Sequence, residues 1–147
     1  MSADCVEPLN ELAGAQFYAV TFLATYLQLQ FQGPRIGERH DMNLEIPPRI
    51  RVGERWFEWG ELGYRDALCD QFGATVRRAE TDIEREQIVM EFESGVLVTM
   101  SLRAEDLDGM EGASYSHSGA WGTKGGDGSL WTAEWKDDWQ RLYTAKQ

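Results

Sequence analysis

Cysteine and histidine are scarce in this chain of 147 residues, which contains two of each. Two isolated cysteines, Cys5 and Cys69, provide neither a disulfide framework nor a thiolate metal cluster. Neither His40 nor His117 has a second ligand at the spacing of a metal site, and both fall in segments that we predict to be loops. We therefore expect no bound metal and no cofactor.

Positive charge is also in the minority. The chain has 14 Lys and Arg against 25 Asp and Glu, which gives a formal net charge of −11. Such a surface repels nucleic-acid backbones and anionic membranes, so we expect neither as a partner. The same charge would attract a basic protein.

Long hydrophobic runs and targeting signals are lacking as well. The most apolar stretch, residues 17–29, is interrupted by Thr, Tyr and Gln, and it is too short and too polar to span a bilayer. The first seven residues show neither the basic nor the apolar region of a signal peptide. Together with the isolated cysteines, these absences predict a cytoplasmic, bacterial-type protein with a single domain over residues 1–147.

The clearest pattern that is present spans residues 87–102. Apolar and polar residues alternate on both sides of Ser94-Gly95, and a period of two around a Gly-containing break predicts a β-hairpin. Gly95 can adopt the positive φ that the tight loop requires. Similar strand-like alternation occurs at residues 16–24, 26–32, 42–46, 50–52 and 75–79.

Helical periodicity predicts one internal helix. Tyr64, Leu68 and Phe72 lie at positions i, i+4 and i+8, and a glycine follows at position 73 as an expected helix end. We expect Leu68 and Phe72 to be buried together with Phe92 and Met100 of the hairpin.

The last third of the chain differs in its glycine content and in the spacing of its apolar residues. Five glycines between residues 119 and 128 predict a mobile Gly-rich loop over residues 112–128, and residues 1–13 are expected to be mobile as well. An apolar stripe then predicts an amphipathic C-terminal helix over residues 129–143. The stripe is spaced by four, four and three residues and consists of Trp131, Trp135, Trp139 and Leu142. The fold class is therefore α+β: a mostly antiparallel β-sheet with one helix packed on it and a C-terminal helix.

No catalytic motif is present. The segment 122–128 has the composition of a phosphate loop but lacks the Gly-Lys-Ser/Thr order, and residues 106–111 lack the spacing of an EF-hand. Ser116 and His117 are adjacent, so on a strand they would point to opposite faces. We assign no catalytic residue and do not expect an enzyme.

Tryptophan is unusually frequent for so short a chain, with six residues. Trp56 and Trp59 precede the internal helix, whereas Trp131, Trp135 and Trp139 form the stripe of the C-terminal segment. Either these indoles fill the protein's own core, or some of them anchor a partner, since Trp is enriched at binding hot spots.

In size, acidity and lack of catalytic groups, the chain resembles small α+β bacterial proteins such as immunity proteins and antitoxins. This likeness is one of type and carries no residues over. The leading hypothesis is a non-enzymatic protein-binding domain with an acidic surface that contains aromatic residues. One alternative is a small-molecule-binding or hydrolytic domain with a pocket between helix and sheet, near Tyr64, Arg65 and His117. Another is a structural subunit of a homo-oligomer.

Overall fold

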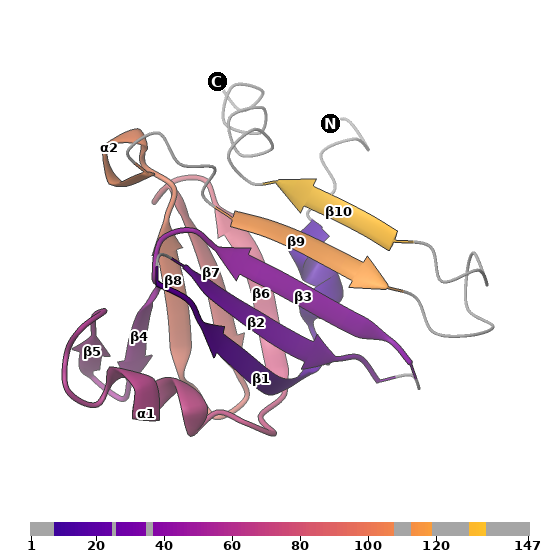
Figure 1. The fold of residues 1–147 in the computed structure, drawn as a ribbon, viewed down its shortest axis with the longest axis horizontal. Helices are drawn as coiled ribbons and strands as arrows, with labels where there is room; N and C mark the ends of the chain where they lie inside the picture. The colour runs from indigo at the N-terminus through magenta and orange to yellow at the C-terminus, as the bar shows by residue number, and fades with distance from the viewer. Residues whose placement is uncertain (1–7, 25, 35–36, 108–112, 119–129, 135–147) are drawn as a thin grey trace.

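The computed structural model describes residues 8–24, 26–34, 37–107, 113–118 and 130–134, and most of them lie in two antiparallel β-sheets of five strands each (Figure 1). The antiparallel architecture confirms the coarse prediction, although the strands form two sheets rather than one. In spatial order, the first sheet consists of β1 (Gln16–Phe22), β2 (Leu27–Gln32), β3 (Arg39–Leu44), β9 (Ala113–Ser118) and β10 (Leu130–Glu134). The second consists of β5 (Arg55–Phe57), β4 (Arg49–Val52), β8 (Leu97–Ser101), β7 (Gln87–Phe92) and β6 (Val76–Asp82).

The predicted hairpin is the centre of the second sheet. β7 and β8 pair antiparallel, with Gln87 opposite Ser101 and Met90 opposite Val98. The loop closes as the amide of Phe92 donates to the carbonyl oxygen of Val96, N···O 3.0 Å. Gly95 has a φ of 93°, which confirms the left-handed position that the sequence predicted.

A short backbone pairing joins the two sheets along one edge. The amide of Val76 donates to the carbonyl oxygen of Ala15 at 2.8 Å. The amide of Phe17 donates to the carbonyl oxygen of Ala74 at 3.0 Å. The amide of Gly73 in turn donates to the carbonyl oxygen of Phe17 at 2.7 Å. We call this pairing of Ala15 and Phe17 with Gly73, Ala74 and Val76 the seam. It makes β1 and β6 neighbours, so that the sheets enclose a common core.

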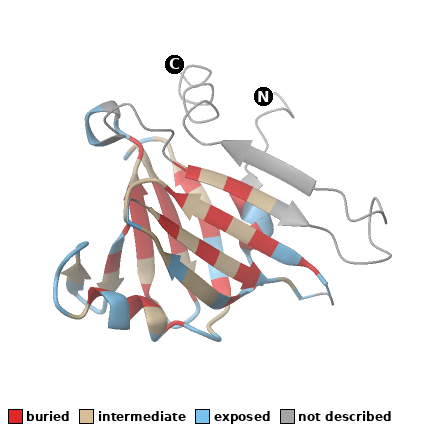
Figure 2. Ribbon diagram, viewed as in Figure 1, coloured by how far each residue is buried: buried red, intermediate tan, exposed pale blue. Residues whose placement is uncertain are grey.

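The core lies between the sheets and is centred on Phe17, which is fully buried. Its ring centroid lies 5.3 Å from that of Phe31 in the first sheet and 5.8 Å from that of Phe92 in the second. Buried and more exposed residues alternate along the strands (Figure 2). The largest fully buried side chains are those of Tyr64, Tyr115, Phe17, Phe31, Phe92, Leu9, Leu12, Leu27, Leu29, Met42 and Leu44.

Helix α1 (Tyr64–Cys69) packs against β4 at one end of the sheets (Figure 1). Leu68 is fully buried, and it belongs to the same core as Phe92 and Met100, as predicted. Phe72, in contrast, is 46% exposed, so its predicted burial is wrong. The helix ends at Cys69. Phe72 therefore lies beyond the helix and does not continue the buried face of Tyr64 and Leu68.

The predicted C-terminal helix over residues 129–143 is not seen. Residues Leu130–Glu134 form strand β10, with Trp131 opposite His117 of β9. Pairing with β9 satisfies the backbone of this segment, and such tertiary pairing overrides a helical spacing of side chains. Residues 135–147, with Trp135 and Trp139, lie outside the described residues.

Two segments that the sequence predicted to be mobile contain ordered elements. The 3-10 helix η2 (Pro8–Leu12) buries Leu9 and Leu12 completely, because it packs against β6. Strand β9 occupies the start of the predicted Gly-rich loop, and Ala113 and Tyr115 are buried in the core. The glycines from residue 119 onward lie outside the described residues.

The remaining helix, α2 (Ala104–Leu107), is a single turn at the end of the sheets opposite α1 (Figure 1). Within the described ranges, no helix combines the length and apolar character needed to cross a membrane.

Substitution of Leu68 tests this packing. Leu68→Ala should lower the free energy of unfolding by about 2–5 kcal/mol because it leaves a cavity in the core. Phe72→Ala should cost less than about 2 kcal/mol, since nearly half of that side chain stays in water. Urea denaturation of both variants measures the difference. Equal losses would mean that the two side chains are equally buried.

Candidate functional site

The structure brings together some of the predicted site residues and separates others. Trp59, Tyr64 and Arg65 lie around one hollow between β5 and α1. Trp56 lies in β5 opposite Arg51, on the outer face of the second sheet. The predicted pocket does not gather His117, because His117 belongs to β9 in the other sheet. The side chains of His117 and Trp131 are outside the described part of the structure.

The loop between β5 and α1 is held by its own hydrogen bonds. The amide of Glu58 donates to Oε1 of Glu61 at 2.7 Å, and the amide of Glu61 donates to the carbonyl oxygen of Glu58 at 3.0 Å. Gly63 has a φ of 94°, and a Cβ added there would lie 3.1 Å from the Phe57 ring. Both the backbone and the space therefore require glycine. The loop exposes Leu62, 95% of whose surface is in water.

Aromatic rings and an arginine flank Leu62. The ring of Trp59 packs edge-on against Tyr64, with centroids 5.5 Å apart, and it stacks on Phe22 at 6.3 Å. The guanidinium of Arg65 lies 5.0 Å from the Phe22 ring centroid and 5.9 Å from that of Trp59. These cation–π contacts hold Arg65 across both rings.

Two neighbouring hollows share Leu62, Gly63 and Asp66 in their linings. Trp59 and Arg65 line the first, Val52 lines the second, and Leu62 and Asp66 line both. Val52 and Trp59 are 40% and 41% exposed. We call the region formed by Val52, Trp59, Leu62, Arg65 and Asp66 the apex surface. It combines exposed apolar groups with a carboxylate and an arginine.

The electrostatic character of the apex surface is acidic on the side of α1. Asp66 and Asp70 both line the second hollow, and both are exposed. The pKa of the Cys69 thiol is raised, first by burial and then by the negative charges of Asp66 and Asp70. The cation beside them, Arg55, lies over the Phe57 ring at 4.2 Å.

The phenol of Tyr64, which lines the first hollow, is engaged in a hydrogen bond. The hydroxyl of Tyr64 donates to the carbonyl oxygen of Pro48 at 2.7 Å, and burial raises its pKa, so this phenol is not available as a base. No group of three or more His, Cys, Asp or Glu side chains in the described ranges could hold a metal ion.

A polar cluster that sequence reasoning missed lies inside the core. His40 was predicted to be a solvated loop residue, but it lies in β3 and is fully buried. Its Nδ1 lies 2.6 Å from the hydroxyl oxygen of Tyr115, and its Nε2 lies 3.4 Å from Oε2 of Glu38. The spacing of His40 with Met42 and Leu44 is the period-two signal that could have placed it on the buried face.

The buried cluster is built into the sheet rather than opened toward a ligand. Glu38 is 7% exposed and lies against Gly33, where an added Cβ would clash with the Glu38 side chain. Burial, together with the negative charges of Glu11 and Glu38, raises the pKa of Tyr115. The cluster therefore links β3 to β9 through a hydrogen bond in a low-dielectric environment.

Trp56 has arginine neighbours of its own. The guanidiniums of Arg49 and Arg51 lie 4.4 Å and 5.8 Å from its ring centroid. The strand register puts Arg51, Leu97 and Glu91 in one row across the outer face of the second sheet. Trp56 is thus a partly buried member of this face and does not join the apex surface.

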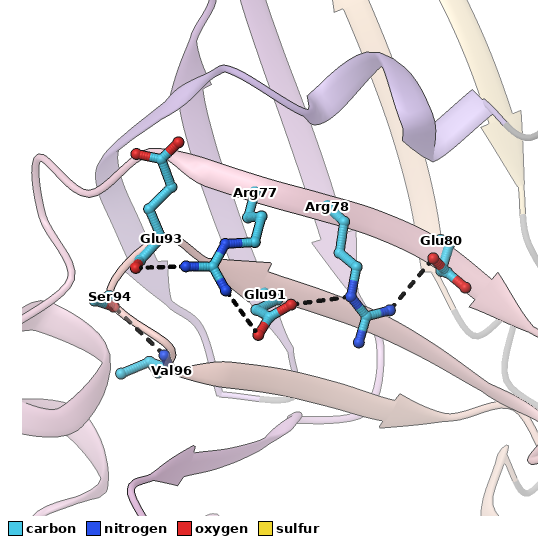
Figure 3. Close-up of polar contacts among 7 residues, drawn as sticks. All are labelled: Arg77, Arg78, Glu80, Glu91, Glu93, Ser94 and Val96. Carbon is cyan, nitrogen blue, oxygen red and sulfur yellow. Dashed lines mark hydrogen bonds and ion pairs between the residues drawn. The ribbon is translucent and has the colours of Figure 1, made fainter.

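Ion pairs cover the other half of that outer face (Figure 3). A bulge between Val76 and Arg78 allows both Arg77 and Arg78 to reach Glu91, at 3.4 Å and 3.0 Å. Arg78 also pairs with Glu80 at 3.3 Å. These arginines are half-exposed, so each pair contributes at most about 1 kcal/mol. Their charges are matched within the protein.

Neither protein-family models, nor curated proteins, nor solved structures gave a match to this chain. The geometry of the described residues is therefore the basis for the function proposed below.

The two buried tyrosines predict how stability depends on pH. Burial raises the pKa of Tyr64 and of Tyr115, whereas in the unfolded chain a tyrosine ionises near pH 10. The unfolded state therefore loses protons first, and the free energy of unfolding should fall as the pH rises above about 10.

Tyr64→Phe and Tyr115→Phe should each reduce this alkaline loss of stability. The measurement is urea denaturation at several pH values between about 8 and 11, and the slope against pH is compared because Tyr64→Phe also loses a hydrogen bond. Slopes equal to that of the original protein would mean that these phenols ionise as readily folded as unfolded.

Proposed function

We propose that this chain is a non-enzymatic protein-binding domain and that the apex surface makes the contact. The observation that carries the proposal is Leu62, which is 95% exposed on a loop fixed by hydrogen bonds and by Gly63. Covering such a side chain removes apolar area from water. Because the loop is already ordered, binding pays little of the entropy that a flexible segment would lose.

The composition of the apex surface supports this function. Trp and Arg are the residue types most enriched among binding hot spots, and Trp59 and Arg65 flank Leu62. Their mutual contact holds both side chains in place before a partner arrives. A net charge of −11 would speed association with a basic partner from a distance, and the apolar contacts would slow its dissociation.

The predicted alternative, a small-molecule or hydrolytic pocket near Tyr64, Arg65 and His117, receives less support. The phenol of Tyr64 is committed to Pro48, and His117 lies in the other sheet. A homo-oligomer would use the same exposed leucine, and the size of the free protein in solution distinguishes that alternative.

Replacing Leu62 tests the proposal. Leu62→Ser should leave the free energy of unfolding within about 0.5 kcal/mol of the original, because 95% of the side chain is exposed. It should weaken binding of a partner about tenfold or more, as expected for a hot spot. Partners are captured from lysates of the source cells, purified, and their Kd values measured against both proteins.

The matched control is Tyr18→Ser. Tyr18 is also a partly exposed apolar side chain, at 38%, but it lines a separate hollow with Arg39. Binding should survive this change, and sedimentation velocity should show whether the partner is a second copy of the chain. If every captured protein binds Leu62→Ser as tightly as the original, the apex surface is not the binding site.

A further inference from the structure

We infer that the apex surface takes a basic, apolar peptide segment, in which a side chain such as Leu or Met lies against Leu62 and a Lys or Arg lies beside Asp66 and Asp70. The inference rests on the proposed function and specifies its partner. Three features of the described residues favour it: an apolar floor, an acidic wall and the balance of nearby charges.

The floor is the second hollow. Val52, Phe57, Leu62 and Ala67 line it, and Gly63 lies among them. Any side chain at position 63 would press on the Phe57 ring, because a Cβ there would come within 3.1 Å of it. Gly63 therefore leaves the Phe57 ring uncovered at this position, among the other apolar groups of the hollow.

The wall is formed by two carboxylates of α1. Asp66 and Asp70 are four residues apart, so they lie on one face of the helical turn, and both line the hollow. Within the described part of the chain, neither carboxylate has an Arg or Lys at ion-pair distance. A cation of the partner would therefore meet two negative charges beside the apolar floor.

The neighbouring arginines are already occupied by aromatic rings. Arg55 lies over Phe57 at 4.2 Å, and Arg65 spans Phe22 and Trp59. Both guanidiniums are therefore held against aromatic rings. The carboxylates of Asp66 and Asp70 face the solvent.

Other occupants fit less well. An acidic segment or an anionic membrane would be repelled by Asp66, Asp70 and the net charge of the chain. A second copy related by two-fold symmetry would place the same patch on itself, so that Asp66 and Asp70 of the two copies would approach like charges.

Selection from a random-peptide display library tests the inference. Peptides are selected on the original protein and then screened for loss of binding to Leu62→Ser. We expect Leu62-dependent peptides that combine Leu, Met, Ile or Phe with neighbouring Lys or Arg. If the Leu62-dependent peptides are acidic or uncharged, the inference is wrong although the proposed function stands. If no peptide depends on Leu62, the inference is wrong, and the Kd values of captured partners against Leu62→Ser decide the proposed function.

A selected peptide then tests the acidic wall. Asp66→Asn and Asp70→Asn should each weaken its binding about threefold, the scale of an exposed charge pair, and replacing the Lys or Arg of the peptide with Glu should abolish it. The matched control is Glu105→Gln, which removes one exposed charge from α2 at the opposite end of the sheets (Figure 1). A loss of binding in the control equal to that in the Asp variants would mean that the net charge attracts the peptide non-specifically.

Discussion

The backbone pairing of β1 with the start of β6 is the constraint on which the other parts of this structure depend. The amide of Phe17 donates to the carbonyl oxygen of Ala74, and its carbonyl oxygen accepts from the amide of Gly73. Its ring packs against Phe31 of the first sheet and Phe92 of the second. A single residue therefore joins the sheets through both hydrogen bonds and apolar contact. The chain that leaves α1 enters the seam directly at Gly73, so the seam also fixes the position of the apex surface.

The distribution of charge connects this scaffold to binding. Arginines are a minority in the chain, and the described ones are largely used within it, on rings such as Trp56 and Phe57 or in pairs with Glu91. The protein thereby leaves much of its negative charge facing solvent, where like charges repel one another. A cation bound beside Asp66 would relieve part of that repulsion, which is a physical reason for the partner that we propose.

The parts of the fold that the sequence predicted are those encoded by patterns within a few neighbouring residues. Alternation around Gly95 identified the central hairpin, because both the turn and its flanking strands are encoded within a few residues. The seam joins residues about sixty positions apart and has no local signature, so one sheet was expected where two occur. The segment around Trp131 pairs with β9, and this non-local partner overrode its helical spacing. At the site, the sequence singled out Trp59, Tyr64 and Arg65 but grouped Tyr64 and Arg65 with His117, which lies in the other sheet, and a leucine in a charged turn such as Leu62 gave no signal.

Native-state hydrogen exchange of the seam amides tests the central claim, that the two sheets form one cooperative unit held at this pairing. The amides of Phe17, Gly73 and Val76 should exchange only through global unfolding, with the same opening free energy as that of Met90 in the middle of the second sheet. An opening free energy at the seam clearly below that of both sheets would mean that the sheets separate while each stays folded, and would contradict this account.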